Sequence, residues 1–480
     1  MTEPLTFSEC LQQIMHKHKL SLGNLAAMIG SRADLRHVLA DDATPIIRNR
    51  LFQKLQESCL FEQADYTKLK QSLEISCLGV ERYRFQRAIE GILAGRPFET
   101  PVDIMTDSGC SLTERMSTLM SAEKIEIICF NSCFHSLVAA LKPLFDDPER
   151  DIHMRHYLHS AANYSLSAEY VESVLPIIFD PRYFSYIRNA SVETQMPCIS
   201  GNLLFIRAIL KNEIIEMCFA FPSEQMVYEM PEPAAASIFS FVSKILQNIK
   251  PQPCPIKEEY PHQMDFPSLC MTFLSHELNR ATYAITNDLC FQQTPTDIAV
   301  AAFLDKGMTS DEESEKIIRR TLSIHEQRYQ NLYHKKKNTY RIMTVKGCED
   351  FLSSGESAEH FVGFRAFTPQ ERKVIFGNML QAAKENPFFI PLLLKDNQFN
   401  HKYNLVCYEK LGVSIDVKDT DYDISNGYRS VFLMHPVFTK QYMDYYLEIL
   451  VPDKCYTRQK SLEMLEKMYD AFLIRYSLNN

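Results

Sequence analysis

The chain has 480 residues, of which 46% are hydrophobic and 23% charged, and its formal net charge is −9 at pH 7. This composition excludes disordered and fibrous proteins and is typical of a globular chain with roughly two to four domains. No apolar run reaches the roughly 20 residues of a membrane-spanning helix, and the first residues lack the pattern of a secretory signal. We therefore expect a cytoplasmic protein with no membrane partner.

Fourteen cysteines are scattered along the chain, and no two of them form a CxxC pair. This spacing argues against a structural zinc site or a redox dithiol. We expect free thiols in a reducing compartment, with no metal and no cofactor.

Charge is distributed unevenly between the N-terminal part and the remainder. Residues 1–96 hold 13 Lys and Arg against 11 Asp and Glu, a net charge of +2. The remaining residues therefore carry a net charge of −11, and the two parts together give the total of −9. A mildly basic N-terminal part joined to an acidic remainder is typical of a DNA-binding module attached to a regulatory part.

The stretch SLGNLAAMIGSRADLRHVL, residues 21–39, predicts two short helices joined by a turn. Ser21 can cap the first helix, apolar residues recur at helical spacing to Ile29, Gly30 can end it, and Ser31 opens the second helix. The second helix is expected to bury Leu35, Val38 and Leu39 and to expose Arg32, Arg36 and His37. Two helices at a steep angle, the second with basic side chains, can place that helix in the DNA major groove.

A longer stretch, LTFSECLQQIMHKHKLSLGNLAAMIGSRADLRHVLADD, resembles the helix-turn-helix of Cro/C1-type (XRE-like) bacterial transcriptional regulators. Leu25, Ala26 and Gly30 stand where that family has its Leu-Ala pair and turn glycine. The resemblance covers roughly residues 5–60 of the 480. It implies a bacterial regulator that binds double-stranded DNA.

The resemblance also implies which side chains contact DNA. Arg32, Ala33 and Arg36 would lie nearest the base edges. Ser31, His37, Arg48 and Arg50 would lie nearest the phosphates. Because the N-terminal part is only mildly basic, one copy would bind weakly, and we expect a homodimer.

Three features depart from the family pattern, and the first is a turn after Gly30 that is one residue shorter than in the family. Leu22 stands where a polar residue commonly contacts a phosphate, and Asp41 and Asp42 follow the second helix, where they would repel phosphates. Leu22 and the two aspartates favour an alternative, a protein-interaction or scaffold protein whose helix-turn-helix-shaped N-terminal part no longer binds DNA.

The rest of the chain changes from helical to mixed patterning. Residues 65–96 predict a helical pair that turns at Gly79. Beyond a polar segment, residues 123–130 predict a buried strand and residues 132–145 a helix, and an antiparallel pair is expected to turn at Lys211-Asn212. The proline-dense Pro251–Pro261 predicts a linker. Strands and helices then alternate to the end, and strand-to-helix order in both mixed regions suggests a distant duplication without a residue-level repeat.

These patterns predict a multidomain protein, with an all-α helix-turn-helix part followed by α/β or α+β regions. The expected domains are a helix-turn-helix domain at 1–60, a helical linker pair at 61–97, an α/β sensor domain at 110–250 and a second α/β regulatory or dimerisation domain at 262–480.

The sequence lacks the common catalytic motifs, including the glycine-rich nucleotide-binding loops, G-x-S-x-G and H-E-x-x-H. The strand with His153, Arg155, Tyr157 and His159 on one face is the strongest enzymatic alternative, as an anion-binding or phosphodiesterase-like site. No H-x-K-x4-D motif accompanies it, so we expect no enzyme. The leading hypothesis is a DNA-binding regulator whose acidic part senses a small-molecule or protein effector.

Overall fold

The structure, a computed structural model, divides into two compact units, Met1–Arg87 and Ala88–Asn480. The residues that it describes are 5–95, 103–131, 135–158, 168–187, 202–223, 226–248, 258–259, 274–286, 289, 291–304, 312–356, 365–395, 403–417, 430–434 and 436–479. Within these ranges, no helix combines the length and apolar character needed to cross a bilayer.

The described part of the N-terminal unit is helical. Its helices are α1 (Phe7–Lys17), α2 (Leu22–Ile29), α3 (Arg32–Leu39), α4 (Pro45–Ser58), α5 (Gln63–Leu78) and α6 (Val80–Ala94), the last of which crosses the boundary between the units. Side chains of Thr6 and Thr44 cap α1 and α4, and Pro45 takes the first position of α4, where its missing N–H costs nothing. The helices predicted between residues 6 and 96 are therefore present.

One apolar core holds these helices together. Fully buried leucines come from five of the helices: Leu11, Leu25, Leu35, Leu51 and Leu69. The helices between residues 7 and 58 alone are too short to be stable in isolation, so this shared core supplies most of their stability.

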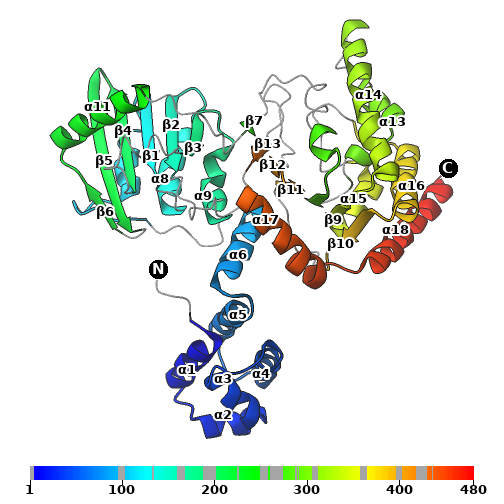
Figure 1. Ribbon diagram of the computed structural model, residues 1–480, viewed down its shortest axis with the longest axis horizontal. Coiled ribbons are helices and arrows are strands. Elements are labelled where there is room, and N and C mark those ends of the chain that lie inside the picture. Colours follow the sequence, from blue (N-terminus) through cyan, green and yellow to red (C-terminus); the bar gives the residue numbers. More distant parts are fainter. Residues whose placement is uncertain are drawn as a thin grey trace. The chain divides into compact units, whose positions relative to one another are not determined.

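The first sheet of the second unit has the strand order β3-β2-β1-β4-β5-β6. Its strands are β1 (Lys124–Phe130), β2 (Asp151–Leu158), β3 (Tyr183–Ile187), β4 (Leu203–Leu210), β5 (Glu213–Ser223) and β6 (Met226–Glu229), and its helices are α7 (Leu112–Ser117), α8 (His135–Phe145), α9 (Ala168–Ile178) and α11 (Glu232–Asn248). Helix α11 packs against β4 and β5 (Figure 1). The predicted hairpin is confirmed, because β4 and β5 pair antiparallel and both Lys211 and Asn212 have the positive φ of a two-residue turn.

The second sheet has the strand order β10-β9-β8-β11-β12-β13-β7. Its strands are β7 (Glu258–Glu259), β8 (Thr282–Ile285), β9 (Thr339–Met343), β10 (Phe389–Leu393), β11 (Tyr403–Tyr408), β12 (Gly412–Val417) and β13 (Ser430–Leu433). The helical segments of this region are η1 (Phe291–Gln293), α13 (Thr296–Leu304), α14 (Glu312–His334), α15 (Val345–Ser354), α16 (Pro369–Glu385), α17 (Pro436–Tyr445), η3 (Tyr446–Lys454) and α18 (Arg458–Asn479).

The two sheets share one topology. In the first sheet β1, β2 and β3 run parallel, β1 pairs antiparallel with β4, and β4, β5 and β6 pair antiparallel in turn. In the second sheet β8, β9 and β10 run parallel, β8 pairs antiparallel with β11, and β11, β12 and β13 pair antiparallel in turn. Strand β7 is an addition at the edge of the second sheet. The equivalence agrees with the suggested duplication at the level of strand order.

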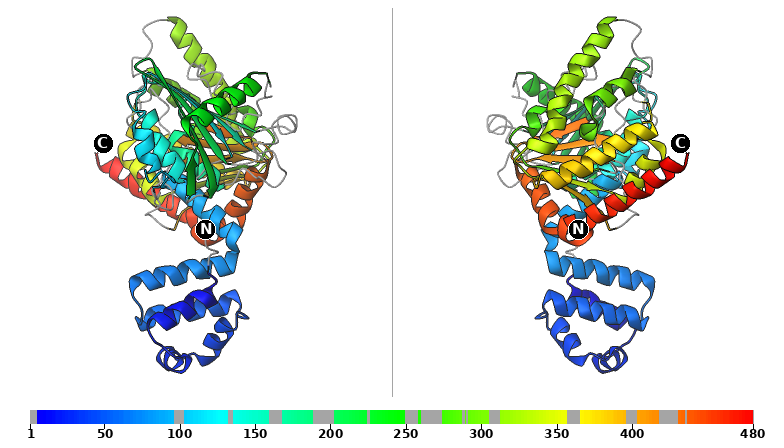
Figure 2. Two further views of the ribbon diagram at one scale, coloured as in Figure 1. Left: turned by 90° about the vertical axis from the view of Figure 1, so that its left-hand side faces the viewer. Right: turned by 90° about the vertical axis from the view of Figure 1, so that its right-hand side faces the viewer.

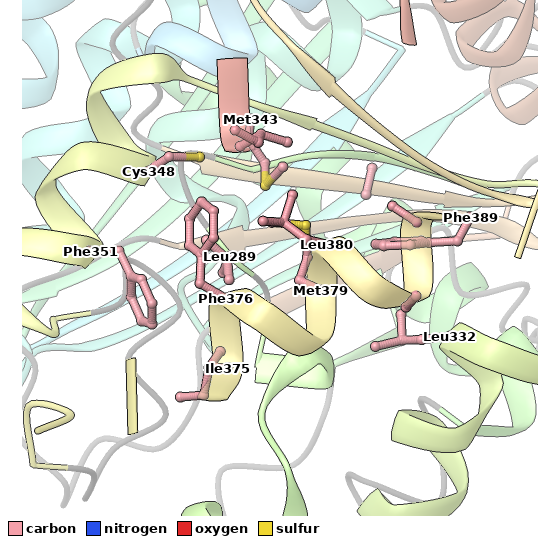
Figure 3. Packing of buried hydrophobic residues seen from close by; sticks show 14 of the residues in the cluster. Leu289, Leu332, Met343, Cys348, Phe351, Ile375, Phe376, Met379, Leu380 and Phe389 are labelled. Carbon is pink, nitrogen blue, oxygen red and sulfur yellow. The ribbon is translucent and has the colours of Figure 1, made fainter. Parts of the chain in front are cut away.

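One hydrophobic core of the second unit lies beside the second sheet. Figure 3 shows side chains of α15 and α16, among them Phe351, Phe376 and Met379, packed together with Met343 of β9. The long helix α18 packs along α16 and β10, and Figure 2 shows α16 in yellow next to α18 in red. This packing places the C-terminal helix against α15 and α16.

The described residues differ from the sequence-based expectations in two places. The predicted linker at Pro251–Pro261 contains β7, which pairs with β13, and its other residues lie outside the described part. The expected fold did not include α9 and β3, which complete the parallel half of the first sheet.

Candidate nucleic-acid interface

Helices α2 and α3 and the turn between them form the predicted helical pair. The Ser21 hydroxyl accepts a hydrogen bond from the backbone N–H of Asn24 at 3.2 Å, which caps α2. Gly30 ends α2 with φ +63° and ψ +25°, a left-handed conformation that glycine adopts without a Cβ penalty. Leu25 and Leu35 are fully buried, so the apolar faces of both helices are fixed in the core of the unit.

The outward face of α3 carries Arg32, Ala33, Arg36 and His37, all of them exposed. Among the described residues, neither the Arg32 nor the Arg36 guanidinium has an ion-pair partner. The His37 ring atom Nδ1 lies 3.0 Å from a carboxylate oxygen of Asp42. The two arginines are therefore the cations of α3 that a polyanion can reach without breaking an existing contact.

Ser31 and Arg50 meet at the same carboxylate, that of Asp34. Ser31 is only 8% exposed, and its hydroxyl donates to Asp34 Oδ2 at 2.6 Å. Arg50 donates to both carboxylate oxygens, from Nε at 2.9 Å and from Nη2. The hydrogen bonds from Arg50 and Ser31 lower the pKa of Asp34 to about 2, so this carboxylate is ionised at neutral pH.

Arg48 is also tied to other parts of the unit. Its Nη2 donates to the carboxylate of Asp41 at 3.0 Å, and its Nη1 donates to the carbonyl oxygen of Ser76 at 3.0 Å. These bonds connect α4 to the end of α3 and to α5, so Arg48 has a structural role in this arrangement.

The seven predicted DNA-contacting residues therefore fall into two groups. Arg32, Ala33, Arg36 and His37 share the exposed face of α3, whereas Ser31, Arg48 and Arg50 make contacts within the unit. Sequence reasoning did not identify Asp34, which organises two members of the second group. The Ser-x-x-Asp spacing of residues 31–34 is a signal for a local side-chain contact, but the partner sixteen residues away could not be read from spacing.

The His-rich strand β2 places its histidines in different environments. His156 is buried, its Nδ1 lies 3.0 Å from the Tyr183 hydroxyl, and burial lowers its pKa to about 3, so it is neutral. His153 lies 3.2 Å from the carboxylate of Asp151 at the surface. His159 lies outside the described residues. In the part of the chain that the structure describes, no three His, Cys, Asp or Glu side chains are grouped to hold a metal ion.

Comparison with known proteins identifies no family. No protein-family profile matches the chain, and no curated protein matches it. Among solved structures, the chain is similar to the polyphosphate kinase of Porphyromonas gingivalis, with 8% sequence identity and a TM-score of 0.21. The match covers 75% of this chain and 53% of the kinase chain, so it spans about half of that protein's length.

The expectation that the chain is not an enzyme is corrected: one of the solved structures similar to the chain is that of a kinase. The missing motifs exclude only the reactions that require those motifs.

Proposed function

We propose that the chain is a DNA-binding transcriptional regulator whose α2–Gly30–α3 pair is a helix-turn-helix of the Cro/C1 type. The observation that carries the proposal is the exposed face of α3, where Arg32 and Arg36 lie one turn apart with no ion-pair partner among the described residues. Two guanidinium groups one turn apart on a short helix can reach neighbouring base edges in the major groove, where arginine pairs with guanine.

The second group of basic residues has a supporting role in this proposal. Asp34 holds Arg50, and Asp41 holds Arg48, so both guanidinium groups are already hydrogen-bonded. These two contacts fix α4 relative to α3 and thereby set the orientation of α3, the helix proposed to contact the bases. Residues 1–96 carry a net charge of only +2, so a single copy would bind weakly and two copies would be needed on one site.

The most informative experiment is selection of bound fragments from genomic or random DNA with the intact chain. We expect enrichment of a short motif, with half-sites about one helical turn apart if the chain binds as a homodimer. Affinity for the recovered fragment should fall with increasing salt, because phosphate binding releases counterions. A selection that recovers no motif at low salt would contradict the proposal.

A second candidate function is protein interaction by the N-terminal unit. It is favoured by two large apolar side chains at the surface of that unit, Ile46 at 76% exposure and Met28 at 55%. Salt separates the two functions, because an apolar interface does not weaken as salt rises. Under this alternative, Ile46→Ser would weaken partner binding, and the Arg32→Ala, Arg36→Ala double variant would not.

A further inference from the structure

A cavity of about 690 Å³ lies among α15, the first turn of α16 and the last turns of α18. Its lining combines apolar side chains with charged ones, including Met468 and Phe472 on α18 and Arg372 on α16. Tyr469 of α18 joins α18 to α16. Its hydroxyl donates to the Lys373 carbonyl oxygen at 2.9 Å, and its ring stacks on Phe376. The cavity is therefore bounded by helices that are fixed against each other.

Arg372 is the unusual group in this cavity. It is only 8% exposed, and its Nη1 donates to the carbonyl oxygen of Leu352 at 2.7 Å, while its guanidinium lies 5.6 Å from the centre of the Phe472 ring. Its buried Nε has no hydrogen-bond partner, and no described carboxylate forms an ion pair with it. Burial accordingly lowers its pKa.

Arg328, another buried arginine of the same unit, has the carboxylate partner that Arg372 lacks among the described residues. Arg328 donates to both carboxylate oxygens of the buried Glu277, at 3.1 and 2.6 Å. Buried charges are normally paired in this way, because an unpaired charge loses its hydration without gaining a compensating partner. Arg372 lacks such a partner and lies at the wall of a cavity, so an anion from solution can supply it.

We propose that this cavity binds an organic anion with one anionic group, a carboxylate or a phosphate monoester on an aromatic or apolar body, with that group on the Arg372 guanidinium. A guanidinium group donates charge-assisted hydrogen bonds to the oxygens of such a group. Phe472 and Met468 offer apolar surface for the body of the ligand. The exposed Arg475 adds a second positive charge at the same cavity.

The opposite wall limits the charge of the ligand. Glu349 and Asp350 of α15 line the same cavity, and Asp350 is paired with Lys346 at 2.6 Å. These carboxylates repel additional negative charge, so they disfavour polyanions and favour a ligand with one anionic group. The site belongs to the unit Ala88–Asn480 and requires no DNA binding by the N-terminal unit.

The test is titration of the intact chain with phenyl phosphate, phenylacetate and the neutral phenylacetamide, followed by calorimetry. We expect saturable binding of phenyl phosphate or phenylacetate, at least roughly tenfold tighter than phenylacetamide, because the charge-assisted contact with Arg372 is lost in the amide. Inorganic phosphate should bind more weakly than phenyl phosphate, because it lacks the apolar body. The stronger of the two aromatic anions identifies whether the group is a phosphate or a carboxylate.

Variants assign the binding to the cavity. Arg372→Gln should weaken binding of the aromatic anion at least roughly tenfold. Arg458→Gln is the matched control. Arg458 lies on α18, is partly buried and, like Arg372, donates to a backbone carbonyl oxygen, that of Ala383 at 2.7 Å, but it does not line the cavity. Equal affinities in wild type and a folded Arg372→Gln variant would overturn the proposal, as would an affinity for phenylacetamide equal to that for the stronger of the two aromatic anions.

Hydrogen–deuterium exchange of the wild-type chain covers the case in which Arg372→Gln does not fold. Saturating phenyl phosphate or phenylacetate should slow exchange in residues 346–356, 369–373 and 465–479, which surround the cavity. Protection elsewhere, or absence of saturable binding by both aromatic anions, would overturn the proposal.

Discussion

Two neighbouring helices of the N-terminal unit, α3 and α4, carry arginines in opposite situations. On α3, Arg32 and Arg36 are exposed and have no ion-pair partner among the described residues. On α4, Arg48 and Arg50 are held by Asp41 and Asp34. The difference shows that the polar face of a helix does not by itself make its cations available, because acidic side chains elsewhere in the fold decide which cations remain to bind a ligand.

Replacement of the α3 arginines should have the largest effect. The Arg32→Ala, Arg36→Ala double variant should lose sequence-specific DNA affinity by about 2–6 kcal/mol, because each arginine–base contact contributes about 1–3 kcal/mol. Its thermal stability should be unchanged, because both side chains are exposed. Fluorescence titration at fixed salt measures the affinity, and the matched control is Lys68→Ala, Lys70→Ala, which removes two exposed cations from α5.

Removal of Asp34 should leave Arg50 of α4 without its carboxylate partner, as Arg32 and Arg36 of α3 already are among the described residues. Asp34→Ala leaves Ser31 and Arg50 without their shared acceptor and should destabilise the α3–α4 region by about 1–2 kcal/mol. Hydrogen–deuterium exchange of α3 and α4 in the intact chain measures this loss. Asp42→Ala, which removes an exposed carboxylate, should change exchange little, and equal effects of the two variants would contradict the role of Asp34.

In the wild-type chain, acid should remove the contribution that the ionised Asp34 carboxylate makes to stability. The pKa of Asp34 is lowered to about 2 in the folded chain from the ordinary 3.8, so its ionised form stabilises the fold above the ordinary value. This contribution should be lost as pH falls from about 4 through about 2, and it should be absent in Asp34→Asn. Comparison of the urea midpoints of the two proteins between pH 2 and 6 gives the test; a difference that does not shrink toward pH 2 would oppose this explanation.

The smallest effect is expected for Arg48. Arg48→Gln removes the contact with exposed Asp41 and keeps a donor near the Ser76 carbonyl oxygen. We expect a loss of about 0.5–1 kcal/mol that shrinks at high salt, because part of the interaction is a surface ion pair. Exchange rates of α4 amides at low and high salt measure the change, and a salt-independent loss would assign the effect to the hydrogen bond with Ser76.

Local features of the fold could be predicted from the sequence. Helical periodicity with Ser21 and Gly30 as its limits predicted α2 and α3, and the turn at Lys211-Asn212 predicted the β4–β5 hairpin. These signals lie within a few residues of the structure that they specify.

Features that depend on distant residues could not be predicted. The contact of Arg50 with Asp34 joins two helices, and no local pattern distinguishes Arg50 from the exposed Arg36. The shared strand order of the two sheets was visible only as a resemblance in element order, because different side chains build the two sheets. The cavity beside Arg372 likewise depends on helices from three separate segments.

The most direct test of the central claim is site-specific photocrosslinking from α3. Ala33 is exposed on α3, on the same face as Arg32 and Arg36. A benzoylphenylalanine at this position should therefore crosslink to bases of a DNA fragment recovered by selection. The same group at Lys70 on α5 should give no crosslink to that fragment. Crosslinks from position 33 that map to the selected motif are the predicted result; crosslinks from position 70 alone, or none from position 33 under binding conditions, would contradict the account.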